Sequence, residues 1–213
     1  LPNQIRSVAI SANGEFIAVG IYCCTVPYHK AYVFHRSSNV PIDSPIDAGH
    51  YNNDIQFSDD GKYLLLSTSA SHRYYSVSRT EINQLWYRVG YCCSSDYYDT
   101  DVSSDGSYVV VIQRTNPGRG VYFLGKDSSE PLWSHNEQPD RNWYSTSMSD
   151  SGRVIAAGTD YTSSNIHMYS WEYAPTEFLF PVSPADNSLV TRNVTLHWAV
   201  DGEDAIDWTY DVY

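Results

Sequence analysis

The stretch IQFSDDGKYLLLS, residues 55–67, decides the fold of this chain. It consists of an alternating segment, an Asp-Asp-Gly turn and a continuous apolar run. Alternation at every second position is typical of a β-strand with one buried face. Glycine at position 61 permits the positive φ that a tight turn between two strands requires. The stretch therefore predicts a β-hairpin whose second strand, residues 63–66, is covered on both faces.

The same pattern occurs three more times along the 213 residues. The other copies are VAISANGEFIAVG (residues 8–20), VSSDGSYVVVI (102–112) and MSDSGRVIAAG (148–158). Their turn glycines, together with Gly61, are Gly14, Gly106 and Gly152, and successive glycines lie 47, 45 and 46 residues apart. A period near 45 with such a turn between two apolar runs is typical of a β-propeller blade. We therefore expect an all-β fold of four-stranded antiparallel blades.

Each copy extends to four predicted strands. The expected blades are residues 1–46, 47–92, 93–138 and 139–180. The side chains predicted to share one face of strand one are Val8 and Ile10, Ile55 and Phe57, Thr100 and Val102, and Thr146 and Met148. The more polar fourth strands are expected at Pro41–Ile42, Leu85–Trp86, Leu132–Trp133 and Phe178–Leu179, where proline suits a sheet edge.

The segments VYFLGKDSSEPLWS (121–134) and VSSDG (102–106) resemble the repeats of WD-repeat and quinoprotein-like propellers. The resemblance covers about residues 1–180 and is closest to versions found in surface-exposed microbial and archaeal proteins. It implies the fold rather than an activity, because propellers host many unrelated functions. The terminal Trp-Asp dipeptide of the WD family is absent from the third strands, and no residue set matches a quinone site. We therefore expect no cofactor.

The period ends near residue 180. A Pro- and Asp-rich segment, residues 180–188, is typical of a domain boundary. Residues 194–198 and 209–213 then alternate like strands and resemble the start of an immunoglobulin or fibronectin type III-like module. We expect residues 181–213 to form part of such a module or to serve as capping strands.

Four blades are few for a closed ring, since propellers have four to eight. An open arc would leave apolar faces and strand edges exposed. The missing blades could lie upstream in a longer chain, a second copy or another protein could complete the ring, or residues 194–212 could cap the open face. The expected partner is therefore a protein or a second copy, and the isolated chain is not expected to behave as a monomer.

Composition narrows the partners and the compartment. The net charge of −12 and pI near 4.7 disfavour nucleic acid and anionic lipid, and no apolar run approaches the 18 residues of a membrane span. The adjacent pairs Cys23–Cys24 and Cys92–Cys93 predict disulfides in an oxidising, extracellular or cell-surface setting, either between the pairs or within each pair. Four free buried thiols are the alternative. Asn193 opens a glycosylation sequon.

Catalytic motifs are absent from the sequence. The seven histidines are scattered, without H-x-H or H-E-x-x-H spacing, and there is no G-x-S-x-G elbow or phosphate-binding loop. The recurring acids Asp59, Asp60, Asp105 and Asp150 are expected to cap turns. The acidic segment 96–101 lacks calcium-loop spacing, so no metal site is predicted.

Aromatic and amide side chains gather in the segments that lead into strand one. Such side chains combine flat apolar surface with hydrogen bonds, as carbohydrate and peptide sites require. They therefore form the predicted ligand-binding set, with packing between blades as the alternative. The set is Tyr51, Asn52, Asn53, Tyr97, Tyr98, Trp143 and Tyr144.

Together these features favour a non-enzymatic, extracellular or cell-surface β-propeller protein. Its role would be structural or in recognition of protein or carbohydrate, in a surface assembly or filament. One alternative is an intracellular WD-repeat scaffold that binds peptides, which predicts free thiols. The other is a fragment of a quinoprotein-like propeller enzyme whose catalytic groups lie outside this chain.

Overall fold

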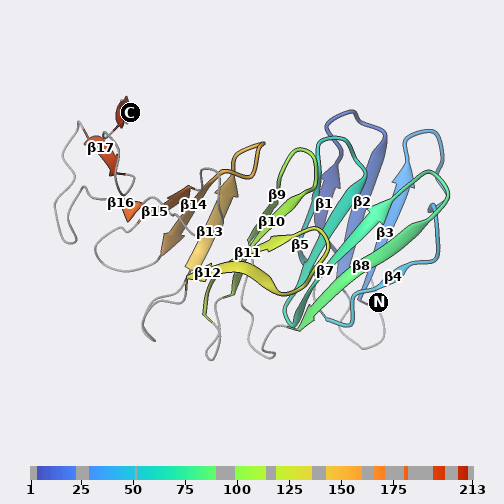
Figure 1. The fold of residues 1–213 in the computed structure, drawn as a ribbon. Coiled ribbons are helices and arrows are strands. Elements are labelled where there is room, and N and C mark those ends of the chain that lie inside the picture. Colours follow the sequence, from blue (N-terminus) through green and yellow to red (C-terminus); the bar gives the residue numbers. More distant parts are fainter. Residues whose placement is uncertain are drawn as a thin grey trace.

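The computed structural model describes ten segments of the chain. They are residues 4–22, 29–50, 52–89, 99–113, 119–135, 143–159, 166–170, 180–181, 194–199 and 206–210. Every regular element within them is a β-strand. The strands form separate antiparallel sheets that are arranged one after another. The first sheet lies at one end of the row and the C-terminal strands lie at the other (Figure 1).

The four repeats give four separate sheets in which strand order follows chain order. The first contains β1 (Gln4–Ile10), β2 (Phe16–Tyr22), β3 (Lys30–His35) and β4 (Ile46–Asp47). The second contains β5 (Asn52–Phe57), β6 (Tyr63–Thr68), β7 (Ser71–Val77) and β8 (Ile82–Val89). The third contains β9 (Thr100–Val102), β10 (Tyr108–Gln113), β11 (Gly120–Gly125) and β12 (Pro131–His135), and the fourth contains β13 (Trp143–Met148), β14 (Val154–Thr159) and β15 (Ile166–Ser170). The all-β prediction, with one antiparallel sheet per repeat, is confirmed.

The predicted fourth strand of the first repeat, Pro41–Ile42, pairs with β3 but does not form the regular strand of this sheet. Pro41 forms only an isolated bridge with Phe34, and the paired strand β4 begins at Ile46. Proline has no N–H to give to a ladder, so regular pairing does not extend through this position. The predictions for the second and third repeats are confirmed, because Leu85–Trp86 lie in β8 and Leu132–Trp133 in β12. Residues 178–179 lie outside the described residues.

The core consists of apolar layers between neighbouring sheets. Phe16, Ala18 and Val33 of the first sheet pack against Ile55 and Phe57 of the second. A second layer joins Leu65, Tyr74 and Trp86 of the second sheet to Val109, Val111 and Tyr122 of the third, and the last layer joins Val110, Ile112 and Phe123 to Met148, Ile155 and Tyr169. Each inner sheet is therefore covered on both faces, which explains why its second strand is a continuous apolar run.

Among the described residues, one face of the first sheet lacks such a layer. Val8 and Ile10 are 56% and 62% exposed. The side chains at the same positions of the later repeats are at most 9% exposed; these are Ile55 and Phe57, Thr100 and Val102, and Thr146 and Met148. The predicted shared face of strand one is thus confirmed, and in the first sheet it is open.

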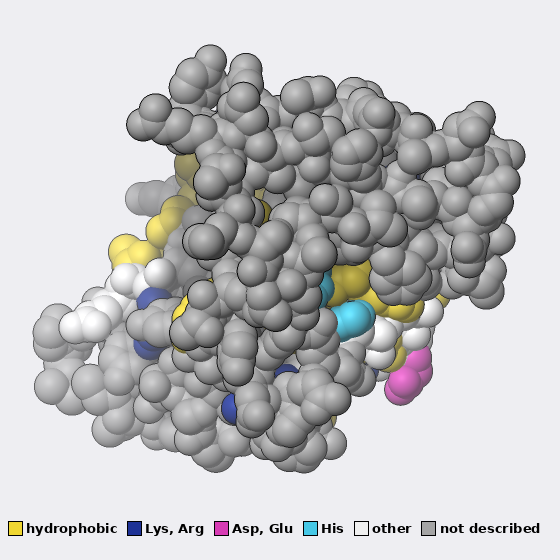
Figure 2. Space-filling view, turned by 90° about the vertical axis from the view of Figure 1, so that its left-hand side faces the viewer, with side chains coloured by type: hydrophobic (Ala, Val, Ile, Leu, Met, Phe, Trp, Pro, Cys, Tyr) yellow, Lys and Arg dark blue, Asp and Glu magenta, His cyan; other side chains and the backbone are white. Residues whose placement is uncertain are grey.

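The C-terminal strands β16 (Phe180–Pro181), β17 (Val194–Ala199) and β18 (Ile206–Tyr210) form a small antiparallel sheet, and β16 lies next to β15. An immunoglobulin-like module or a cap remains a prediction for this region. Figure 2 shows this end of the molecule, where hydrophobic and histidine side chains of described residues lie together. No helix in the described segments has the length and hydropathy to cross a bilayer.

Candidate functional site

The first strands of the four sheets line one cavity. These strands, β1, β5, β9 and β13, lie side by side, so the first-strand edges of the four sheets come together. The cavity between them has a volume of about 460 Å³. Its apolar lining includes Val8, Ile10, Phe57, Val102 and Met148, and its polar lining consists of Gln56, Asp59, Asp101, Ser104 and Asp150. Three carboxylates from three sheets therefore share this cavity.

The position of an acid within its turn decides whether it caps the turn or lines the cavity. Directly before the turn glycine, Asp60 Oδ1 accepts hydrogen bonds from Ser58 Oγ at 2.8 Å and from Lys62 N at 3.0 Å. Asp105 Oδ1 accepts equivalent bonds from Ser103 Oγ and Ser107 N, both at 2.9 Å. The capping prediction is confirmed for these two acids.

Asp59 and Asp150 stand one residue earlier in their turns. Their side chains are exposed and line the cavity. Their backbones tie the turns together, because Asp59 N donates to Ser104 O at 3.0 Å and Ser104 N donates to Asp150 O at 2.8 Å. These bonds fix the spacing of the cavity wall.

Asp101 has a structural part in the same wall. Its Oδ2 accepts hydrogen bonds from Met148 N at 2.7 Å and from Ser147 Oγ at 3.2 Å. Both donors belong to the next sheet, so this carboxylate joins β9 to β13. Asp101 is therefore held in place by the fold, whereas Asp59 and Asp150 present exposed carboxylates.

Two further acids hold the sheets together near the cavity. Asp54 Oδ2 accepts a hydrogen bond from Thr100 Oγ1 at 2.7 Å, and Asp99 Oδ2 accepts one from Thr146 N at 2.8 Å. Burial raises the pKa of both carboxyl groups. Asp99 entered the sequence predictions only as part of the acidic segment 96–101, and Asp54 did not enter them; both stand seven residues before a turn glycine, which was the available signal.

The predicted aromatic set is only partly within the described residues. Trp143, the first residue of β13, is buried, and its ring centroid lies 5.9 Å from that of His135 and 4.9 Å from that of His167. These histidines belong to β12 and β15, so Trp143 packs between the third and fourth sheets. The neighbouring Tyr144 is 44% exposed.

The other members of that set leave the binding prediction untested. Asn52 and Asn53 begin β5, and their side chains are not described. Tyr51, Tyr97 and Tyr98 lie outside the described residues. The predicted disulfide cysteines and the glycosylation site also lie outside them; these are Cys23, Cys24, Cys92, Cys93 and Asn193.

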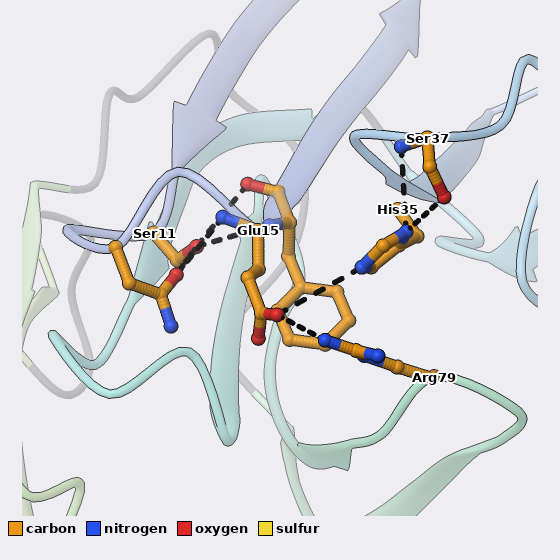
Figure 3. Close-up of polar contacts among 7 residues, drawn as sticks. Ser11, Glu15, His35, Ser37 and Arg79 are labelled. Atoms are coloured by element: carbon orange, nitrogen blue, oxygen red, sulfur yellow. Dashed lines mark hydrogen bonds and ion pairs between the residues drawn. The ribbon is translucent and has the colours of Figure 1, made fainter.

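A second polar cluster joins the β1–β2 turn and the end of β3 in the first sheet to the β7–β8 turn of the second (Figure 3). Ser37 Oγ lies 2.7 Å from His35 Nδ1, and His35 Nε2 lies 4.0 Å from Glu15 Oε1. The order of groups is that of a serine nucleophile, a base and an acid, but the Ser37 backbone N–H also donates to His35 Nδ1 at 3.3 Å. This geometry is a turn cap. Glu15 in turn accepts a hydrogen bond from Arg79 of the second sheet, which lowers the pKa of Glu15, so the cluster acts as a clamp.

No group of three or more His, Cys, Asp or Glu side chains suited to a metal ion occurs within the described segments. The cavity itself is lined by three carboxylate groups, those of Asp59, Asp101 and Asp150. Hydrogen bonding and attraction of positive charge are the interactions such groups provide.

The sheets, their shared inner edge and the cavity define the class as a β-propeller, of which this chain forms an open arc. The fold is similar to hydrazine synthase from Kuenenia stuttgartiensis, with a TM-score of 0.58 and 18% identity over 93% of this chain and 62% of that one. It is also similar to the β-propeller domain of Myceliophteria thermophila Cps50 (Swd1), with a TM-score of 0.59 and 12% identity over 80% of this chain and 52% of that one. A protein of unknown function from Desulfotomaculum acetoxidans gives a TM-score of 0.56 and 11% identity over 95% of this chain and 70% of that one.

At such low identity these similarities show the fold alone. The chain spans 62% and 52% of the first two structures, so it corresponds to part of a propeller of their size. No protein-family model matches the chain, and no curated protein matches its sequence.

Proposed function

We propose that this chain is a non-enzymatic β-propeller module that recognises a protein or carbohydrate at the cell surface. The observation that carries the proposal is the cavity to which the first strands of all four sheets contribute. Its volume, about 460 Å³, is within the range of ligand sites in proteins, roughly 300–1,000 Å³. Such a cavity at the inner edge of the sheets suits recognition of a ligand group that enters from outside.

The charge of the cavity favours one kind of ligand group. Asp59 and Asp150 are exposed carboxylates on its wall, and Asp101 adds a third negative charge. The chain as a whole carries a net charge of −12, so anionic ligands are repelled. A lysine or arginine side chain of a protein ligand would form charge-assisted hydrogen bonds there. Carbohydrate hydroxyl groups are the second candidate, because carboxylates accept their hydrogen bonds as well.

The proposed setting is extracellular, with a structural or recognition role in a surface assembly. The acidic charge and the two cysteine pairs support this setting. The intracellular scaffold alternative predicts free thiols, so peptide mapping without reductant separates the two. Disulfide-linked peptides containing Cys23, Cys24, Cys92 or Cys93 are expected.

A binding experiment tests the site itself. Peptide and glycan arrays are probed with the chain and with the double variant Asp59→Asn, Asp150→Asn. The matched control is Asp127→Asn, which removes an exposed carboxylate from the turn between β11 and β12, away from the cavity. We expect the double variant to lose about tenfold or more in affinity for basic peptides, consistent with loss of charge-assisted bonds, and the control to bind normally.

Two results would contradict the proposal. Equal affinity of the chain and the double variant would remove the cavity as the site. Preferential binding of acidic peptides would remove the charge argument.

A further inference from the structure

The same contact recurs at each of the three junctions between the four sheets. The turn glycine of one sheet lies against an aromatic ring of the sheet before it. A Cβ atom at Gly61 would lie 3.0 Å from the ring of Phe16, one at Gly106 would lie 2.1 Å from Tyr63, and one at Gly152 would lie 2.6 Å from Tyr108. Each ring belongs to the first residue of a second strand, β2, β6 or β10. At all three junctions, therefore, an aromatic ring of one sheet packs on the glycine turn of the next.

The first sheet presents the same turn without a ring. Gly14 has φ of 67°, close to the 70–73° of its three counterparts, so its turn has the same conformation. Apart from its own neighbours in sequence, no residue that the structure describes lies within 4 Å of the position of a Cβ atom at Gly14. The exposed Val8 and Ile10 lie on the same side of the chain, at positions that a preceding sheet covers in every later repeat. Two independent observations thus indicate one vacant junction.

The vacant junction continues as an apolar surface over the first sheet. Ile17 and Val19 of β2 are half-buried, whereas their counterparts Leu64 and Leu66 in β6 are fully buried. We name this surface the open face and define it by Val8, Ile10, Gly14, Ile17 and Val19. Its side chains are apolar at the same positions that pack against a neighbouring sheet in the later repeats.

The fourth sheet of a second copy does not fit the open face. At the position of the aromatic residue it carries Val154, which is 38% exposed, and the next positions on that face are Ala156 and Gly158. Valine has no ring to cover Gly14, and this is the difference that matters, because Ala156 and Gly158 match Ala18 and Gly20 of the first sheet, which does pack on the second. The solved propellers that this chain resembles are longer than it, since it spans 62% and 52% of the first two.

We infer that the open face binds a further β-sheet of the same repeat type, whose second strand begins with Phe or Tyr. The ring of that residue packs on Gly14, and the sheet covers Val8 and Ile10. The sheet comes from polypeptide other than the fourth sheet of this chain. The inference is independent of the proposed recognition role, because it concerns the junction and not the cavity ligand.

The test adds such a sheet to the chain. A second copy of residues 47–92, which contains Tyr63 at the required position, is fused in front of Leu1. The matched control carries Tyr63→Val in the added copy alone, which imitates Val154. In repeat proteins an added repeat stabilises its neighbour through their interface. We expect the extended chain to melt about 5 °C higher than the original and the β1 amides to exchange at least tenfold more slowly, and the valine control to show less than half of each gain.

Light scattering on the original chain tests the competing occupant. We expect self-association that Ile10→Asp abolishes and Val154→Asp leaves unchanged. A stable dimer that both substitutions abolish would make a second copy the occupant and overturn the inference. Equal gains from the tyrosine and valine extensions would overturn it too, and so would failure of both extended chains to fold while the original chain folds.

Discussion

Replacing one isoleucine in the first sheet and one in the second measures directly how open the first sheet is. Ile10 and Ile55 lie on the same face of strand one in successive repeats. Ile10 is 62% exposed and Ile55 is 2% exposed. Substitution of each by alanine therefore makes the same chemical change in two environments.

The structure sets the size of the two effects. Ile→Ala removes three carbons, about 0.8 kcal/mol each when fully buried, or about 2.4 kcal/mol in transfer free energy. At Ile55 a cavity is left as well, so we expect a loss of about 3–4 kcal/mol in the free energy of unfolding. At Ile10 little more than a third of the side chain is buried, so we expect roughly 1 kcal/mol. With about 2–4 °C per kcal/mol for a chain of this size, the melting temperature falls by about 10 °C for Ile55→Ala and about 3 °C for Ile10→Ala.

Urea denaturation followed by tryptophan fluorescence gives both free energies, and thermal melting gives an independent check. The denaturant slope must stay unchanged, so that the comparison concerns stability alone. Equal losses for the two variants would refute the reasoning, because they would mean that Ile10 is covered in solution. A loss at Ile10 that grows with protein concentration would locate the cover in self-association.

Three further predictions concern single positions. Gly14→Ala should cost about 1 kcal/mol through its positive φ, whereas Gly106→Ala should cost more because Tyr63 must also move, as thermal denaturation will show. Burial lowers the pKa of His72 to about 3, so the unfolded chain, with an ordinary pKa near 6.5, takes up the proton first. Stability should therefore fall as the pH drops from about 6.5 towards 3, and His72→Gln should flatten this slope in urea titrations between pH 5 and 7. Burial raises the pKa of Asp54, so the stability that this group contributes is lost as the pH rises through that pKa. Asp54→Asn should remove this pH dependence in urea titrations, but it should also lower stability at every pH, because the amide keeps only one of the two oxygens that accept hydrogen bonds from Thr100 and Ile55.

The sheets could be predicted because each repeat combines two signals that agree. A glycine turn and an apolar run after it leave few alternatives to a hairpin, and four copies in register confirm one another. The fourth strand of the first repeat could not be placed in this way. Pro41 and Ile46 stand in a polar segment without periodicity, so only the three-dimensional pairing shows which of them begins the strand.

The cavity was harder to predict than the sheets. Its wall depends on how far each sheet is shifted relative to the next. Alignment of the repeats in the sequence does not reveal this shift. Asp59 and Asp60 are adjacent and chemically identical, yet one lines the cavity and the other caps the turn. Asp54 and Asp99 could have been found from their shared register, but the partners that they hold belong to the following sheet.

The open face and the cavity share two residues, and this links the two proposals physically. Val8 and Ile10 are exposed although their counterparts in the later repeats are buried, and both also line the cavity. A sheet on the open face would cover these side chains and add a further wall to the cavity beside Asp59 and Asp101. A ligand that contacts the added wall would therefore bind the completed arc more tightly than the isolated chain. By thermodynamic linkage the same ligand would strengthen the attachment of the added sheet by the same factor.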